Sequence, residues 1–222
     1  WRNDSQSSHT PKLYRNLGNG KFIDITEKAG LDTPMYGMGV ATVDFDNDDN
    51  QDIYFTNVGS NFLFGNNGNA TLTNVTNISN TGGSDWSTSA LFFDYDRDGW
   101  LDLFVTNGAV KRMEEKIAAG DPYPLSQPDQ IFLNLGDSRF EEIAPGRAII
   151  LQHEAVGRGA SFGDIDNDGD IDILVTNNCG FSKLLQNKIG SNNSWLGLDL
   201  RRSDGHVAVN TRCEIENATG SI

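Results

Sequence analysis

Apolar residues occur along this chain in short runs, and each run is bounded by clusters of Gly, Asn and Asp. Examples of such runs are Lys21–Ile25, Gly39–Val43, Ser89–Phe93 and Gln130–Leu133. Strands are short and end at turn-forming residues, whereas helices need a longer apolar periodicity, so the pattern favours strands. It predicts an all-β protein whose strands are joined by tight turns.

A repeat organises these strands. A nine-residue acidic segment occurs three times without gaps, at 44–52, 94–102 and 164–172, and each copy runs into an apolar stretch that ends in Thr-Asn. A second signature precedes every copy, and a further start of it follows the third copy. Its first residues are Asn16, Asn66, Asn134 and Asn187.

A unit of about 50 residues with several short strands is the size of one blade of a β-propeller. Closed propellers use roughly 4–8 blades, so three copies do not close a ring. We therefore expect a partial β-propeller that is a fragment of a larger protein. An insertion at 108–129 lengthens the spacing between the second and third copies. Within the insertion, 111–119 has a helical pattern and the remainder is predicted to be extended.

The acidic segments place carboxylates at alternate positions of a tight turn, where side chains can point towards one centre. With the backbone carbonyl of the seventh residue they form an all-oxygen shell, which suits Ca²⁺. Two carboxylates roughly 4 Å apart repel by about 4 kcal/mol at an effective dielectric near 20, so a cation among them favours folding. We predict about three Ca²⁺ ions, one per segment, with these ligands: Asp44, Asp46, Asp48, Asn50 and Asp52; Asp94, Asp96, Asp98, Trp100 and Asp102; Asp164, Asp166, Asp168, Asp170 and Asp172.

An EF-hand is the obvious alternative to this interpretation. It requires flanking helices and a bidentate Glu at the twelfth position of the loop. The twelfth positions here are Phe55, Val105 and Val175, and β-branched and aromatic residues flank the segments. The segments are therefore predicted to be calcium turns between strands. The first copy departs from the other two in having Asp49 in place of Gly at its sixth position.

Charge and composition narrow the classes of function. The chain has 31 acidic and 17 basic side chains and a net charge of −14. This balance argues against a nucleic-acid partner, because phosphate requires a basic surface, and against docking on an anionic membrane. No apolar run approaches the roughly 18 residues that a membrane span needs, so we expect no membrane insertion.

The paired signatures resemble the FG-GAP-like, VCBS-type repeats of calcium-bearing propellers, the architecture of integrin α-subunit heads, over about Leu13 to Asn187. The segment 127–136 and the tail from Asn193 are similar, more narrowly, to the cartilage acidic protein group, in which a small β domain called ASPIC/UnbV follows a propeller. The resemblance implies propeller blades over 1–190 and the beginning of an incomplete ASPIC/UnbV-like domain over 191–222. It also implies a secreted or cell-surface protein.

These observations favour a calcium-binding, extracellular recognition or adhesion module that is not an enzyme and whose partner is a protein or a glycan. Two alternatives stay open: a propeller enzyme acting on polysaccharide or ester substrates, and a purely structural repeat of a larger surface protein. The segment 159–163 matches the GxSxG nucleophile motif, but an acidic turn rather than a helix follows Ser161. Trp86 and Trp100 are candidates for an exposed binding patch.

Overall fold

The computed structural model of the chain describes residues 9–111, 118, 120, 125–144, 154–178, 180–189, 200–208, 216–217 and 220–221. The chain divides into two compact units, Trp1–Asn192 and Asn193–Ile222. Most of the helix predicted over 111–119, and both Cys179 and Cys213, lie outside the described residues. Within the ranges that are described, no helix is long and apolar enough to cross a membrane.

The first unit contains three antiparallel sheets that follow the sequence repeat, and we call them blades 1, 2 and 3. Blade 1 consists of β3 (Gly37–Val43), β4 (Asp52–Asn57), β5 (Phe62–Asn66) and β6 (Leu72–Asn74). Blade 2 consists of β7 (Ser87–Phe93), β8 (Asp102–Asn107), β9 (Gln130–Asn134) and β10 (Phe140–Glu142). Blade 3 consists of β11 (Gly157–Gly163), β12 (Asp172–Asn177) and β13 (Lys183–Leu185).

The remaining elements are short. A two-stranded hairpin, β1 (Tyr14–Asn16) and β2 (Phe22–Asp24), precedes blade 1 and carries the first copy of the Asn signature. One turn of helix, α1 (Thr76–Ser79), follows β6. The second unit contains the strand pair β14 (Glu216–Asn217) and β15 (Gly220–Ser221). The assignment of this unit to an ASPIC/UnbV-like domain stays a prediction.

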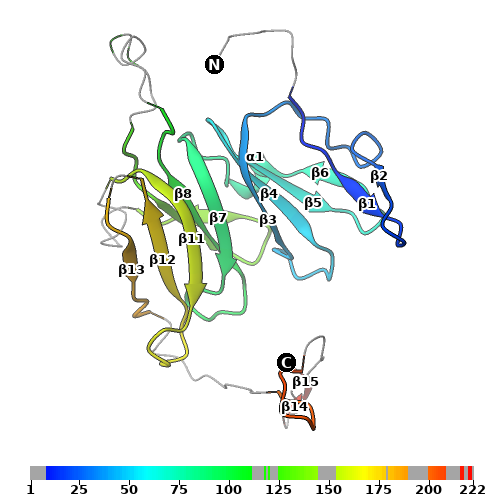
Figure 1. The fold of residues 1–222 in the computed structure, drawn as a ribbon, viewed down its shortest axis with the longest axis vertical. Coiled ribbons are helices and arrows are strands. Elements are labelled where there is room, and N and C mark those ends of the chain that lie inside the picture. The colour runs from blue at the N-terminus through cyan, green and yellow to red at the C-terminus, as the bar shows by residue number, and fades with distance from the viewer. Residues whose placement is uncertain are drawn as a thin grey trace. The chain divides into compact units, whose positions relative to one another are not determined.

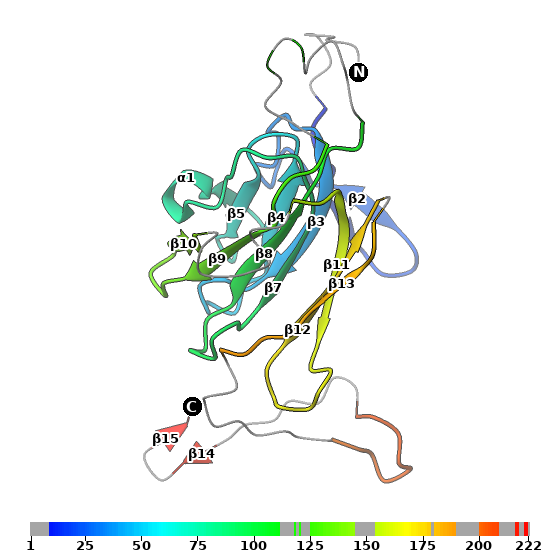
Figure 2. The same cartoon turned by 90° about the vertical axis from the view of Figure 1, so that its left-hand side faces the viewer.

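The predicted all-β, partial-propeller architecture is confirmed. The strands of each blade follow one another in chain order, and all pairs are antiparallel. The first strands of neighbouring blades, β3, β7 and β11, lie next to one another (Figure 1). Figure 2 shows the blades overlapping in the view turned by 90°. The strands predicted from the apolar runs are present as β2, β3, β7 and β9.

The hydrophobic core lies between blades rather than within one. The cluster between blades 1 and 2 includes Tyr54 and Leu63 from one side and Leu103 and Phe132 from the other. Residues at the corresponding positions of blades 2 and 3 form the next cluster. This arrangement follows from the alternation of side chains along a strand, because each sheet has two faces and both are apolar. A blade therefore buries its faces only when another blade covers them.

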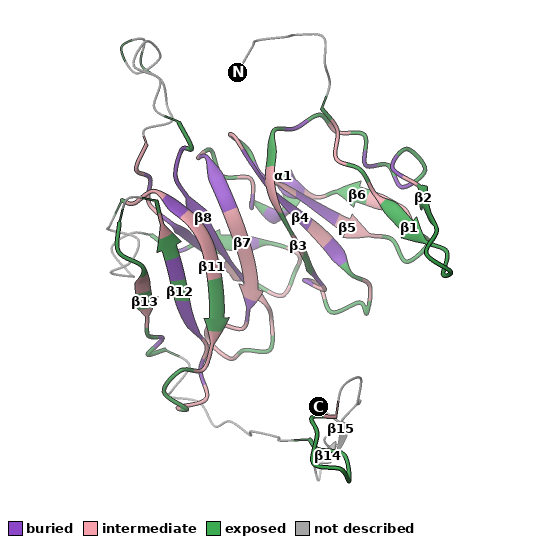
Figure 3. Cartoon of the chain, in the orientation of Figure 1, coloured by how far each residue is buried: buried purple, intermediate pink, exposed green. Residues whose placement is uncertain are grey.

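The outer face of blade 3 lacks such a cover among the described residues. Leu174 and Leu184 are directly paired across β12 and β13, and they are 40% and 49% exposed. The corresponding pair in blade 2, Phe104 and Ile131, is buried. In Figure 3, β8 is buried along its whole length, whereas β12 carries both buried and exposed residues.

The opposite end of the blade series also has an open face. The outer face of blade 1 is partly covered by the segment 25–35 and by the residue before β1, which contribute Leu31, Met35 and Leu13 to a third apolar cluster. A groove of about 460 Å³ remains beside β3, and Val40 in its lining is 65% exposed. Both ends of the described blades are therefore apolar.

Candidate metal centre

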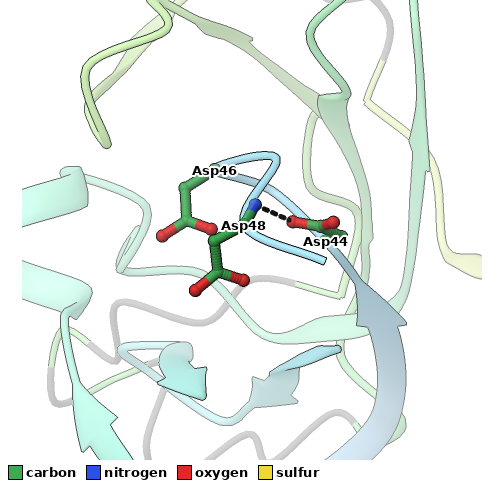
Figure 4. Close-up of side chains that lie close together, drawn as sticks. All are labelled: Asp44, Asp46 and Asp48. Carbon is green, nitrogen blue, oxygen red and sulfur yellow. Dashed lines mark hydrogen bonds between the residues drawn. The ribbon is translucent and has the colours of Figure 1, made fainter. Parts of the chain in front are cut away.

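Each acidic loop joins the first and second strands of its blade and folds by hydrogen bonds to its own first carboxylate. In the first loop, the backbone N–H of Asp48 donates to Asp44 Oδ1 at 3.0 Å (Figure 4). The backbone N–H of Asp49 donates to Asp44 Oδ2 at 2.9 Å. In the second loop, Asp98 and Gly99 donate to Asp94 in the same way. In the third, Gly169 donates to Asp164 Oδ2 at 3.0 Å.

The loop needs left-handed backbone geometry at its fourth and sixth positions. The sixth residues, Gly99 and Gly169, have φ angles of 92° and 87°, and Asp49 has the same sign at 67°. Asp tolerates this region at some cost, because its short polar side chain can bond locally. The first loop therefore adopts the same turn as the other two, despite the substitution at its sixth position. The fourth residues also have positive φ angles; they are Asn47, Arg97 and Asn167.

The ninth residue of each loop ties the loop to the third strand of its blade. Asp102 Oδ2 accepts the backbone N–H of Tyr95, and its Oδ1 accepts that of Asn134, at 2.8 Å each. Asp52 and Asp172 make the corresponding pairs of bonds, and all three of these carboxylates belong to residues that are 1% exposed. Such a carboxylate can share its remaining lone pairs with a metal ion while it holds the loop in place.

The structure brings together three carboxylates in each loop. In each group, the carboxylate oxygens lie within 4.8 Å of one another, and the groups are Asp44, Asp46 and Asp48; Asp94, Asp96 and Asp102; and Asp164, Asp166 and Asp172. Asp52, Asp98 and Asp168, which the sequence also predicts as ligands, stand outside these groups. The backbone N–H groups of Asn50, Trp100 and Asp170 donate to Asp48, Asp98 and Asp168, respectively. The role of their carbonyl groups as ligands stays a prediction.

Buried carboxylate oxygens test whether these loops fit a cation. Asp46 Oδ1 and Asp164 Oδ1 are buried and have no hydrogen-bond partner among the described residues. Burial, and then the neighbouring carboxylates of Asp48 and Asp44, raise the pKa of Asp46. Burial likewise raises the pKa of Asp52 to about 6 and that of Asp102 to about 7. Negative charge is therefore unfavourable here without a counter-charge, which an oxygen-binding divalent ion would provide.

The third loop has cationic side chains of the protein beside it. The ammonium group of Lys188 lies 3.2 Å from Asp166 Oδ2 and 3.5 Å from Asp168 Oδ2. Gln186 Nε2 also donates to Asp166 Oδ2, at 3.0 Å. From the second loop, Arg97 Nη2 donates to the backbone carbonyl of Asp168 at 3.4 Å.

Neighbouring loops are linked by two of the Asn residues that begin a signature, Asn134 and Asn187, a role that sequence reasoning missed. Asn134 Nδ2 donates to the carbonyl of Phe45 in the first loop, and Asn187 Nδ2 donates to that of Tyr95 in the second, both at 2.8 Å. Each of these Asn side chains therefore reaches the loop of the preceding blade. The signal in the sequence is the recurrence of this Asn at or just beyond the end of the third strand of each blade.

Other candidate features have structural roles. Ser161 lies in the middle of β11, paired with Leu174, so the strand-to-helix turn of a nucleophile elbow is not formed around it. Trp86 is buried, which removes it from any exposed binding patch. Trp100 packs against Gly136, whose φ is 72° and where an added Cβ would lie 2.8 Å from the indole ring. Gly136 is therefore needed both for the turn and for this close approach.

Comparison with known proteins supports the interpretation of the repeat. A family model described as an FG-GAP-like repeat matches residues 3–55, 44–105 and 117–175. Cartilage acidic protein 1 of Homo sapiens is 29% identical over 208 residues, which cover 88% of this chain and 29% of that protein. The same protein of Xenopus tropicalis is 28% identical over 204 residues, with 88% and 30% covered. The chain thus spans less than a third of the length of these relatives.

A solved structure gives a weaker likeness. It is that of an Agrocybe aegerita lectin, described as the basis of specific recognition of non-reducing terminal N-acetylglucosamine. The sequence identity is 17%, the TM-score is 0.40, and the match covers 82% of this chain and 48% of that one. A similarity of this size says nothing about the ligand of the present chain.

Proposed function

The chain belongs to the FG-GAP-like repeat family, and from this premise we propose that it is a non-catalytic recognition module whose blades are stabilised by Ca²⁺. The three acidic loops carry the proposal. Each gathers carboxylates around one centre, and Asp46 and Asp164 each leave a buried oxygen without a hydrogen-bond partner among the described residues. An all-oxygen donor set of this kind suits Ca²⁺ better than a transition metal.

The residues that would hold the ions are those at the first, third, fifth and ninth positions of the loops, together with the seventh backbone carbonyl. A bound Ca²⁺ supplies the positive charge that cancels the repulsion within each loop. The role is structural, because each set of ligands comes from a single turn whose ninth residue also fastens the third strand of its blade. Ion binding is therefore expected to stabilise the packing of the blade, and an intact blade is expected to raise the affinity for the ion.

The proposed setting is outside the cell, on a secreted or cell-surface protein. A ligand present at about one hundred times its dissociation constant stabilises the folded state by about 2.7 kcal/mol. Extracellular free Ca²⁺ is high enough to meet this condition for a site of micromolar affinity, whereas cytosolic free Ca²⁺ is not. The similarity to cartilage acidic protein 1 supports the same setting.

The proposed partner is a protein or a glycan. The strand ends opposite the acidic loops differ between blades: β4 and β5 are joined by a short turn, whereas the insertion 108–129 separates β8 from β9. Variable loops on a constant scaffold are where binding specificity is usually carried.

Removal of the ion tests this proposal. Chelation with EGTA should lower the melting temperature by at least about 10 °C, since each site contributes about 2.7 kcal/mol and 1 kcal/mol shifts the melting temperature by about 2–4 °C at this size. The triple variant Asp46→Asn, Asp96→Asn, Asp166→Asn should no longer respond to EGTA. The exposed carboxyl of Asp32 supplies the matched control, Asp32→Asn, which should respond like the wild type. A wild-type melting curve that EGTA does not change would reject the metal assignment.

A further inference from the structure

The three acidic loops have the same turn but different surroundings. The residue after the linking Asn is Asn67 in blade 1, Leu135 in blade 2 and Lys188 in blade 3. Of these three side chains only Lys188 is charged. Its ammonium group approaches Asp166 Oδ2 at 3.2 Å and Asp168 Oδ2 at 3.5 Å, so it contacts two of the four carboxylates predicted as ligands.

The residue before the linking Asn reinforces this contact. Gln186 Nε2 donates to the same Asp166 oxygen at 3.0 Å, where the equivalent residues Gly65 and Leu133 have no side-chain donor. Asp166 Oδ2 thus accepts bonds from two protein donors. A metal ion that uses this oxygen has to displace Lys188 or remain close to it.

We infer that Lys188 is a built-in counter-ion that makes the third loop the weakest of the three calcium sites and the first to empty when Ca²⁺ falls. The inference rests on the proposed function, since it ranks sites that the proposal assigns. The physical reason is competition between charges: an ammonium group partly neutralises Asp166 and Asp168 before any divalent ion arrives.

The size of the effect follows from Coulomb's law. Even in bulk water, repulsion between a unit charge and a divalent ion about 4 Å apart lowers affinity by at least about tenfold. The ion pair itself adds little stability, because the Lys188 side chain is 60% exposed. Lys188 is therefore expected to alter the calcium affinity of its loop much more than the stability of the unloaded protein.

The test measures Ca²⁺ binding at each loop separately. The backbone amides of Asp49, Gly99 and Gly169 donate to the first carboxylates of their loops, so their NMR resonances report on the three loops independently. Titration of the calcium-free chain with Ca²⁺ should shift the Gly169 resonance last. In Lys188→Leu, which introduces the residue found at the equivalent position of blade 2, Gly169 should respond at an approximately tenfold lower Ca²⁺ concentration.

Two further variants make the result specific. Lys188→Gln removes the charge while keeping a polar side chain, so it should reproduce the shift even if Leu disturbs the loop. Lys12 forms a similarly exposed ion pair with Asp24 at 3.1 Å, away from the acidic loops. Lys12→Leu is the matched control and should leave all three titrations unchanged.

The outcomes separate this inference from the proposed function. If all three amides respond to Ca²⁺ but neither Lys188 variant changes the Gly169 titration, the inference is wrong and the calcium sites stand. The inference is also wrong if Gly169 responds before either Asp49 or Gly99 in the wild type. If no amide responds to Ca²⁺ at millimolar concentration, the proposed function fails, and the inference fails with it.

Discussion

Blades 2 and 3 share the pairing of their first three strands and the same acidic turn, yet they differ in what covers them. Ile131 on β9 is 2% exposed, whereas its equivalent on β13, Leu184, is 49% exposed. The side chains are similar in size and apolarity; the difference is that blade 3 packs on Ile131 and no described blade packs on Leu184. The repeat therefore encodes a blade, and the neighbouring blade decides how much that blade is stabilised.

The sharpest test of this comparison is truncation of the equivalent aliphatic side chains. Ile131→Ala should lower the free energy of unfolding by about 2–5 kcal/mol, because it leaves a cavity between two blades. Leu184→Ala should cost less than about 1 kcal/mol, as expected for a half-exposed side chain. Urea denaturation at saturating Ca²⁺ measures both. Equal costs would show that the outer face of blade 3 is covered in solution.

A second difference concerns a buried acid at the end of blade 2. Asp129 Oδ1 accepts the N–H of Asn107 at 3.0 Å, and its Oδ2 is buried without a hydrogen-bond partner among the described residues. In blade 1 the equivalent Asn61 donates its Nδ2 to Ser87 Oγ of the next blade, but Asp129 faces Gly157, which has no side chain. Burial raises the pKa of Asp129 to about 6.

This raised pKa predicts a pH dependence. The neutral Asp129 carboxyl contributes to the free energy of unfolding. This contribution is fully present below the unfolded-state pKa of 3.8 and is lost as the pH rises through the folded-state pKa of about 6. Relative to the wild type, Asp129→Asn should therefore gain about 2 kcal/mol of unfolding free energy between pH 4 and pH 7. The acidic loops titrate alike in both proteins, so their contribution drops out when the unfolding free energy of the wild type is subtracted from that of the variant. The exposed control Asp32→Asn should show no such gain, and a pH-independent difference for Asp129→Asn would contradict the prediction.

The smallest expected effect concerns the Asn residues that link neighbouring loops. Asn134 Nδ2 bonds both Phe45 O and Leu101 O, whereas Asn187 Nδ2 bonds Tyr95 O. Loss of a buried hydrogen-bond partner costs about 1–3 kcal/mol, so Asn134→Ala should destabilise the protein more than Asn187→Ala does. Hydrogen exchange should also show faster opening of the first loop in Asn134→Ala.

A milder control keeps this last experiment interpretable. Asn66 Nδ2 bonds only Gln51 O, within its own blade, so Asn66→Ala should affect blade 1 alone. From the repeat alone, each ion would be expected to stabilise its own blade independently. The Asn134 and Asn187 bonds instead predict that neighbouring loops are coupled. If Asn134→Ala left the first loop as protected as in the wild type, the link would have no energetic weight.

Much of the site could be predicted from the sequence because its chemistry is local. Carboxylates at alternate positions of one nine-residue turn need only that turn to come together, so Asp44, Asp46 and Asp48 meet whatever surrounds them. The strand assignments had the same basis, since alternation and turn residues act over a few positions. The contribution of Asn134 could not be predicted, because its partner Phe45 lies 89 residues away in the chain.

The sequence by itself determined the blade: its strands, its acidic turn and the apolar character of both its faces, because each depends on contacts between residues near in the chain. Only the tertiary structure decided which faces are buried, which Asn reaches a neighbouring loop and which carboxylates have a lysine beside them. These depend on how successive blades lie against each other. Identical local patterns in blades 2 and 3 therefore acquire different burial, and the second and third loops acquire different electrostatic surroundings.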